Sequence, residues 1–430
     1  MFSVYRRKIF SFLQKDGSRR VLSNFTWLSV LQIVEKLVPM VTIPYLIRVI
    51  GIEKWGLITF SQSFVLYFGT IVGYGFHMTA VREISMNQNN KEEISGIFSS
   101  VIMAKFILCI FSFFLYLTIV FSFKNFYKEL TVFLINYGYV VGYMLFPDWF
   151  FQGMEKMKFS TILVSISRFF FLVLIFIFIR RPSDYVYVPL LNSIGIFVAG
   201  ILGLGIAFHT FKIRFKIPTL TEIIFQFKNG WHIFLSQLFL SLYTNTRVFV
   251  LGIFTNNTIV GYYAIAEKIT NLLGIPLGIF ANAIYPRLSY LYTKSKSSFL
   301  KVFKYLSVGG FIWGAAIVLL GYMFAPFIVL FFTGKPINTE IRLCLNLLLL
   351  ALFFNQISVL YMQNFVVIGK PQTFSRIYMI VGLSGAFVIL LLSYFFSYIG
   401  TGIASIVVES FVFFLSIYYR NAINKGANFV

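Results

Sequence analysis

Stretches of mostly apolar residues, each about 20 residues long, recur from one end of the chain to the other. A helix of about 20 apolar residues is long enough to cross the hydrocarbon core of a bilayer. Short breaks that are basic or contain glycine or proline separate these stretches. With 59% hydrophobic and only 12% charged residues, the chain does not have the composition of a water-soluble domain. The sequence therefore predicts an all-α polytopic membrane protein.

We predict twelve transmembrane helices from these stretches. Their approximate bounds are 24–48, 57–77, 99–121, 131–151, 161–179, 186–208, 231–254, 258–285, 306–332, 343–367, 377–397 and 400–419. No small-residue cleavage site follows the first of them, so we expect it to be retained rather than removed as a signal peptide.

The formal net charge of +22 could suggest binding to nucleic acid, but the basic residues alternate with the predicted spans. The N-terminal segment, the even-numbered loops and the C-terminal tail hold 23 of the 36 Lys and Arg residues, whereas the opposite side, with Arg48 at the far end of the first span included, holds 8. Loops that stay in the cytoplasm carry such an excess of basic residues. We therefore predict a multi-pass membrane protein with both termini in the cytoplasm, in contact with anionic lipids and not with nucleic acid.

An internal repeat relates the two halves of the chain. Three pairs of identical residues share an offset of 205 positions: Gln32 and Gln237, Gly56 and Gly261, and Arg82 and Arg287. Because one repeat contains six predicted spans, an even number, both halves cross the membrane in the same direction. This is the parallel-repeat pattern of many secondary transporters.

The repeat predicts two six-helix bundles around a central cavity. We expect a basic cytoplasmic segment at 1–23, an N-terminal bundle at 24–208, a cytoplasmic linker at 209–230, a C-terminal bundle at 231–419 and a cytoplasmic tail at 420–430. In the linker, Leu220–Phe227 is expected to form an amphipathic piece on the membrane surface.

Ionisable residues inside predicted spans are candidates for function, because a charge in the bilayer is costly unless it is paired or hydrated. They are Glu35, Lys36, Lys105, Asp148, Arg168, Arg247, Glu267, Lys268 and Glu409. A structural role is the alternative for each of them. Lys105 and Arg168 could extend to the lipid headgroups, and the adjacent opposite charges could simply neutralise each other.

Polar stripes on the first and seventh spans favour function over that alternative. Gln32, Glu35, Lys36 and Pro39 share one helical face, and Gln237, Ser241 and Thr244 share another, with Arg247 one turn further on. We expect the two stripes to face a central cavity. A surplus of cationic side chains there would suit a phosphate-bearing substrate.

Neither cysteines nor histidines indicate a metal or redox site. Cys109 and Cys344 lie in apolar spans of different halves and are expected to be small core residues. His77, His209 and His232 lie near span ends without ligand spacing. We predict no metal and no cofactor.

Several sequence blocks within about the first 160 residues form a distinctive set: Pro39, Thr42–Tyr45, Arg48–Gly51, Trp55–Gly56, Tyr74–Phe76, Ala80–Glu83 and Asp148–Lys156. These blocks resemble those of O-antigen repeat-unit flippases, which belong to the polysaccharide transporters of the multidrug/oligosaccharidyl-lipid/polysaccharide exporter superfamily. By this resemblance we expect the chain in the bacterial cytoplasmic (inner) membrane.

This resemblance implies two six-helix bundles and a flippase that carries undecaprenyl-diphosphate-linked oligosaccharide repeat units from the cytoplasmic to the periplasmic leaflet. It implies alternating access driven by a proton or sodium gradient, for the synthesis of O-antigen (lipopolysaccharide), capsule or exopolysaccharide. A polysaccharide polymerase and a chain-length regulator are partners that such a role would allow.

We assign expected roles to the polar and charged residues of the spans. Substrate binding is expected from Lys36, Arg48, Arg247, Lys268, Gln32 and Gln237, and ion coupling from Glu35, Asp148, Glu267 and Glu409.

Two other functions compete with a flippase. A membrane polysaccharide polymerase or ligase would need a large periplasmic loop, whereas every predicted outward loop has about ten residues or fewer. A drug antiporter of the same fold is disfavoured by the expected cationic cavity. The sequence contains no motif that points to catalysis or ATP hydrolysis, so we expect a transporter and not an enzyme.

Overall fold

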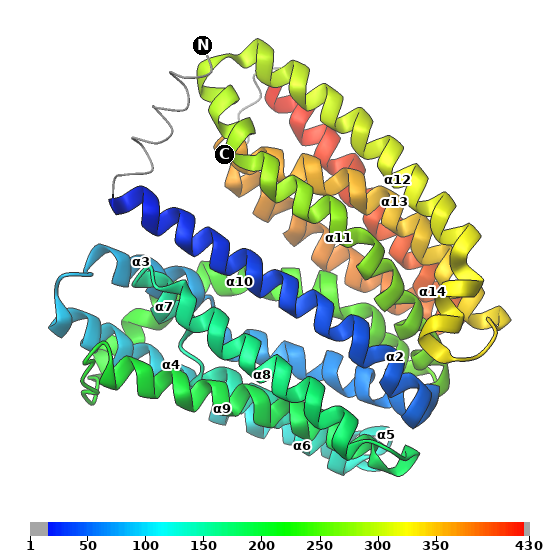
Figure 1. Cartoon of the computed structure of the whole chain (residues 1–430), viewed down its shortest axis with the longest axis horizontal. Helices are drawn as coiled ribbons and strands as arrows, with labels where there is room; N and C mark the ends of the chain where they lie inside the picture. Colours follow the sequence, from blue (N-terminus) through cyan, green and yellow to red (C-terminus); the bar gives the residue numbers. More distant parts are fainter. Residues whose placement is uncertain (1–15, 425–430) are drawn as a thin grey trace. The chain divides into compact units, whose positions relative to one another are not determined.

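The computed structural model describes residues 16–424, and within these bounds it leaves the side chains of a few residues undescribed. The described part is helical and contains no strand. Its helices are α2 (Asp16–Gly73), α3 (Phe76–Met86), α4 (Lys91–Ser122), α5 (Lys124–Tyr127), α6 (Leu130–Leu145), α7 (Asp148–Gly153), α8 (Met157–Phe178), the 3₁₀ helix η1 (Pro182–Val186), α9 (Tyr187–His209), α10 (Leu220–Phe254), α11 (Asn257–Lys294), α12 (Lys296–Thr333), α13 (Thr339–Val367) and α14 (Pro371–Asn424) (Figure 1).

Within residues 16–424, nine helical segments are long and apolar enough to cross a membrane. This confirms a multi-pass helical membrane protein, while the number of twelve spans stays a prediction. Two long helices each cover two predicted spans. The backbone of α2 is interrupted at Gly51 (φ 83°), and that of α14 at Ser397 (φ 55°). Glycine adopts a positive φ at little cost because it has no Cβ.

Two element boundaries differ from the sequence prediction. The predicted span 131–151 is divided into α6 and α7, because Pro147 between them has no N–H to continue the helical hydrogen bonds. Helix α10 begins at Leu220, so the piece Leu220–Phe227, expected to lie on the membrane surface, is continuous with the predicted seventh span.

The described residues form two compact units. The first contains the residues before Pro44 together with Val65–Gln237, and the second contains Pro44–Phe64 together with the residues from Leu238 onward. The predicted bundles, 24–208 and 231–419, follow the sequence repeat. Pro44–Phe64, from the N-terminal half, belongs to the second unit, and the bounds of the predicted bundles stay a prediction.

The first unit is built on α3, α4 and α6–α9, and its core gathers around the block that begins at Asp148. Trp149, Phe150 and Phe151 are almost completely buried, and the ring of Phe98 from α4 packs on Trp149 with 5.5 Å between ring centroids. This aromatic part of the family-like block therefore holds the unit together. The residues that follow α9 run along α4, where the backbone N–H of Lys216 donates to the hydroxyl of Ser99 over 3.0 Å.

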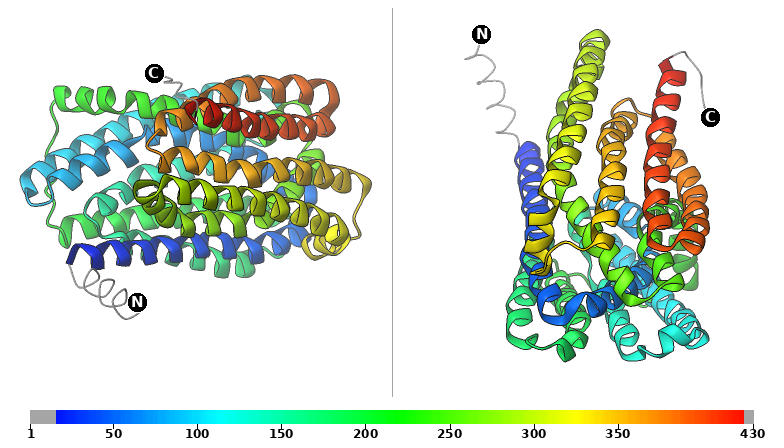
Figure 2. Two further views of the ribbon diagram at one scale, coloured as in Figure 1. Left: turned by 90° about the horizontal axis from the view of Figure 1, so that it is seen from above. Right: turned by 90° about the vertical axis from the view of Figure 1, so that its right-hand side faces the viewer.

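In the second unit, α13 packs against α11, α12 and α14 (Figure 2). The segment of α2 after Gly51 joins them through a very close helix contact. A Cβ on Gly56 would lie 1.9 Å from the carbonyl oxygen of Asn257 and 2.6 Å from the backbone nitrogen of Gly261. Gly56 and Gly261, which the sequence repeat pairs, therefore lie against each other.

Candidate functional site

A cavity of about 260 Å³ lies within the second unit, between α10, α11, α13 and α14. Leu348, Ala351 and Leu352 form the apolar part of its wall. The polar and charged residues that line it are Tyr243, Thr244, Arg247, Glu267, Thr270, Asn271, Asn355 and Glu409. Such a collection of polar groups is unusual in a chain whose charged residues amount to 12%.

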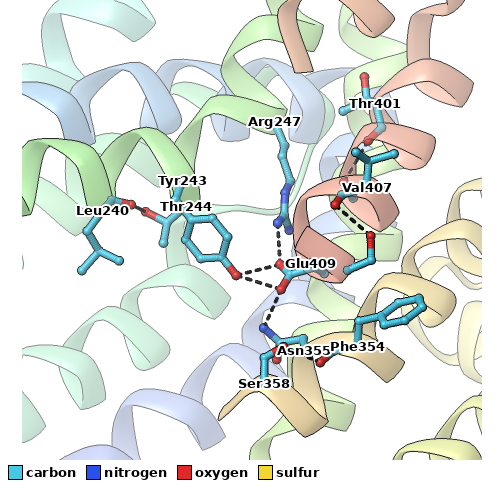
Figure 3. Close-up of polar contacts among 12 residues, drawn as sticks. Leu240, Tyr243, Thr244, Arg247, Phe354, Asn355, Ser358, Thr401, Val407 and Glu409 are labelled. Atoms are coloured by element: carbon cyan, nitrogen blue, oxygen red, sulfur yellow. Dashed lines mark hydrogen bonds and ion pairs between the residues drawn. The ribbon is translucent and has the colours of Figure 1, made fainter. Parts of the chain in front are cut away.

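Glu409 of α14 is the centre of the hydrogen bonds in this cavity (Figure 3). Its carboxylate accepts a bond from Arg247 Nη2 at 2.6 Å and from Asn355 Nδ2 at 3.1 Å. The hydroxyl of Tyr243 lies 2.8 Å from both carboxylate oxygens. Two residues of α10 and one of α13 thus hold a carboxylate that is only 3% exposed.

The helical period of α10 explains why two of these donors meet the same carboxylate. Tyr243 and Arg247 are four residues apart, so their side chains lie one above the other on one face. The guanidinium carbon of Arg247 lies 5.6 Å from the centre of the Tyr243 ring, within range of a cation–π interaction. The pair of charges is sequestered, with 14% of the Arg247 side chain and 4% of the Glu409 side chain exposed.

Arg247 does not use all of its donors. A guanidinium carries five N–H donors. The Nε of Arg247 is buried and has no hydrogen-bond partner among the described residues. Because Arg247 lines the cavity, a ligand with several acceptor oxygens could take up donors that the protein leaves unused.

A second cavity, of about 290 Å³, lies within the first unit. Glu35 of α2, Asp148 of α7 and Arg168 of α8 are its charged lining residues. Arg168 Nη1 donates to Asn192 Oδ1 over 3.3 Å, and the rings of Tyr139 and Tyr143 complete much of the polar wall. Arg168 thus faces this cavity, which supports a role beyond contact with lipid headgroups.

Lys105 of α4 is 2% exposed and does not extend to a headgroup. Its ammonium donates to the carbonyl oxygens of Tyr143 at 2.9 Å and Phe146 at 3.4 Å. These carbonyls belong to the C-terminal end of α6, where the helix dipole favours a cation. Lys105 therefore stabilises the break between α6 and α7.

The structure brings together some of the predicted site residues and separates others. Arg247, Glu267 and Glu409 share one cavity, and Glu35 and Asp148 share the other. Arg48 instead donates to the carbonyl oxygens of Leu330 and Phe331 at the end of α12. Gln237 and Lys268 are not among the residues that line the two cavities, and the side chains of Gln32 and Lys36 lie outside the described part of the structure.

Among the described residues, each of these two cavities is lined by two carboxylates and one guanidinium. The fold thus places acidic residues from distant spans in the same cavity as each arginine. The central cavity with surplus cations that the sequence predicts stays a prediction.

Sequence reasoning missed Tyr243 and Asn355. Tyr243 lies one helical turn before Arg247, a spacing that could have identified it. Asn355, a polar amide within a long apolar span, was a weaker signal. Within residues 16–424 no group of three or more His, Cys, Asp or Glu residues is arranged to hold a metal ion, and both cysteines are buried free thiols.

The family described as "Polysaccharide biosynthesis protein" matches residues 21–292. A protein of Escherichia coli (strain K12) named as an O-antigen transporter is 29% identical over 392 residues, which is 90% of this chain and 94% of the relative. A protein of Shigella dysenteriae with the same name is 28% identical, over 80% of this chain and 86% of the relative.

Solved structures share the fold at low sequence identity. The lipid II flippase MurJ in an inward closed conformation has a TM-score of 0.73 and 15% identity, covering 91% of this chain and 87% of that one. An inward-facing multidrug resistance transporter of the MATE family, in the MOP superfamily, has a TM-score of 0.69 and 16% identity, covering 94% of this chain and 100% of that one. The chain thus shares the fold of these transporters.

Proposed function

Because the chain belongs to the polysaccharide biosynthesis protein family, we propose that it is a flippase, a transporter and not an enzyme, that moves a lipid-linked oligosaccharide across the bacterial inner membrane. Its substrate is an undecaprenyl-diphosphate-linked repeat unit, carried from the cytoplasmic to the periplasmic leaflet for O-antigen, capsule or exopolysaccharide. The names of the two bacterial relatives and the fold shared with a lipid II flippase support this proposal.

The observation that carries the proposal is the partly unsatisfied Arg247 guanidinium in a membrane-embedded cavity. A substrate diphosphate offers several acceptor oxygens to such a group. Further substrate contacts come from Lys36, Lys268, Arg48, Gln32 and Gln237. In this structure the guanidinium of Arg48 binds the end of α12. In the proposal, Arg48 therefore contacts the substrate only in another state of the transport cycle.

An ion gradient drives the cycle in this proposal. The carboxylates of the two cavities bind the coupling proton or sodium ion: Glu35 and Asp148 in the first unit, Glu267 and Glu409 in the second. Binding of a cation to a buried carboxylate changes the balance of charge around the neighbouring arginine, and alternating access follows from that change.

The proposal includes an orientation in the membrane and two partner proteins. Both termini lie in the cytoplasm, in agreement with the distribution of basic residues. A polysaccharide polymerase and a chain-length regulator act on the flipped repeat units in the periplasm.

Deletion of the gene in its native host tests the function directly. Complete, unpolymerised lipid-linked repeat units should accumulate on the cytoplasmic leaflet, where a membrane-impermeant glycan-modifying reagent cannot reach them in intact cells. Accumulation of single units on the periplasmic leaflet would instead identify a polymerase or ligase. A deletion that leaves surface polysaccharide normal but sensitises the cells to cationic drugs would identify a drug antiporter.

A variant carrying Lys36→Gln and Arg247→Gln should restore little surface polysaccharide in the deletion strain. Export is measured per amount of folded protein in the membrane, because loss of Arg247 also lowers stability. Normal export by this variant would contradict the assigned substrate contacts. Lys91→Gln, which removes a positive charge from an exposed residue outside the lining of both cavities, is the control and should restore export.

A further inference from the structure

The carboxylate of Glu409 is surrounded as a bound oxyanion would be. An arginine, a tyrosine hydroxyl and an asparagine amide converge on its two oxygens at 2.6 to 3.1 Å. We call Tyr243, Arg247 and Asn355 the oxyanion cradle (Figure 3). The same donor types bind phosphate oxygens, and charge-assisted bonds from arginine are the strongest among them.

The cradle has unused capacity and adjacent space. Arg247 Nε is buried without a partner among the described residues, and all three cradle residues line the cavity of about 260 Å³. A carboxylate has two acceptor oxygens, whereas a phosphate group in a diphosphate offers more. A phosphate in the position of the Glu409 carboxylate could therefore accept the same three donors and keep further oxygens for other donors.

As long as Glu409 is ionised, the charges of the cavity oppose the replacement of its carboxylate by a phosphate. Arg247 is the only cation that lines the cavity among the described residues, and Glu267 and Glu409 are both anionic when ionised. A diphosphate entering beside two carboxylates meets repulsion from both, and Arg247 is already paired. Substrate and Glu409 thus require the same donors.

We propose that Tyr243, Arg247 and Asn355 form a subsite for a phosphate group of the lipid-linked substrate, and that Glu409 is an internal competitor that occupies this subsite when no substrate is bound. This inference rests on the proposed function, and it adds that the Glu409 carboxylate keeps the substrate phosphate out of the oxyanion cradle. Neutralisation of Glu409 by a cation frees Arg247, which links cation binding to substrate binding at one ion pair.

Other charged and titratable groups lie near the ion pair of Arg247 and Glu409. Tyr243 and Tyr378 interact with Glu409, Tyr263 and Glu267 interact with Arg247, and Lys268 interacts with Glu267. Glu267 is the useful comparison among them, because it lines the same cavity while the carboxylate of Glu409 alone accepts the bonds of the cradle.

The test measures binding of radiolabelled farnesyl diphosphate to the full-length protein in nanodiscs of neutral phospholipid. Glu409→Gln keeps the size of the side chain and removes its negative charge, so affinity should rise about tenfold or more. Glu267→Gln removes the same charge from the same cavity and should raise affinity less than about threefold. Adding Arg247→Gln to Glu409→Gln should abolish the gain.

If Glu409→Gln and Glu267→Gln raised the affinity for farnesyl diphosphate equally, the net charge of the cavity would explain the result. The proposal that Glu409 competes with the phosphate would then be wrong. Weaker binding by Glu409→Gln would overturn it as well. If Glu409→Gln does not fold, Glu409→Asp serves instead, because the shorter side chain withdraws the carboxylate from the cradle. Its affinity should exceed that of the wild-type protein, and an unchanged value would contradict the proposal.

The binding experiment and the deletion experiment can fail separately. If the deletion strain accumulates repeat units on the cytoplasmic leaflet but Glu409→Gln binds the probe no better, only the competition is wrong. If the deletion strain transports the units normally, the proposed function is wrong, whatever the probe shows.

Discussion

The ion pair between Arg247 and Glu409 is buried, and burial determines what the loss of either partner costs. A charge that is withdrawn from water needs a partner of opposite charge, so a single remaining buried charge lowers the stability of the folded protein. The network on Glu409 also includes Tyr243 and Asn355, which keep part of its carboxylate satisfied if Arg247 is removed. The loss of stability caused by substituting one of these residues therefore depends on which of the others are still present.

Arg247→Gln should lower the free energy of unfolding by up to about 3–5 kcal/mol, because it leaves the Glu409 carboxylate without its cation. The double variant with Glu409→Gln should lose less than the sum of the single changes, since it removes both charges. Thermal unfolding of the purified protein in one detergent would measure this coupling. Additive losses would show that the two charges do not stabilise each other.

Lys105→Met should also destabilise the protein, by about 1–3 kcal/mol, because the carbonyls of Tyr143 and Phe146 would lose their buried donor. The same unfolding measurement applies. Lys91→Met is the matched control, since Lys91 lies on the same helix with an exposed side chain and should change stability little. An equal loss in both variants would contradict the buried role of Lys105.

At the scale of elements, close helix contacts depend on glycine. The segment of α2 after Gly51 approaches α11 so closely that a methyl group at Gly56 would overlap backbone atoms of Asn257. Backbone atoms cannot move aside as the end of a flexible side chain can. The two helices would have to separate along their contact.

Gly56→Ala should therefore lower the free energy of unfolding by about 1–3 kcal/mol or more and reduce the yield of folded protein. Fluorescence-detected size-exclusion chromatography after heating would reveal the loss. Gly69→Ala, in the same helix with no atom within 4 Å of the added Cβ, is the control and should behave as the wild-type protein. A stable Gly56→Ala variant would mean that the contact is looser than described.

Sequence alone predicted the type of nearly every element, because hydrophobic stretches of this length have one structural outcome in a membrane. It also predicted that Arg247, Glu267, Asp148 and Glu409 lie in membrane-embedded segments. It could not predict which of them meet. The partner of Arg247 is 162 residues away in the chain, and no periodicity relates α10 to α14.

At the scale of the whole molecule, the units do not follow the order of the sequence. Pro44–Phe64 belongs to the unit formed by the C-terminal residues. A repeat in the sequence reveals equivalent positions but not the partners of a given helix segment, because a segment that is apolar on several sides can pack on many surfaces. The sequence therefore could not predict that Pro44–Phe64 packs in the second unit.

The orientation of the chain can be tested with single cysteines, because both native cysteines are buried. A membrane-impermeant maleimide added to spheroplasts should label Ser183→Cys, which lies in a predicted periplasmic loop, and should label Ser297→Cys only after permeabilisation. Both serines are exposed in the structure. The positive-inside distribution of basic residues is the physical reason for this result. The reverse pattern would place the termini in the periplasm.

The contact between Gly56 and Gly261 means that the two helices constrain the same pair of positions from both sides. A Cβ on Gly261 would lie 2.2 Å from the carbonyl oxygen of Ile52, and a Cβ on Gly56 would lie 1.9 Å from that of Asn257. A larger residue at either position would therefore push apart the same two backbones. The two positions that the sequence repeat pairs thus cannot vary independently of each other.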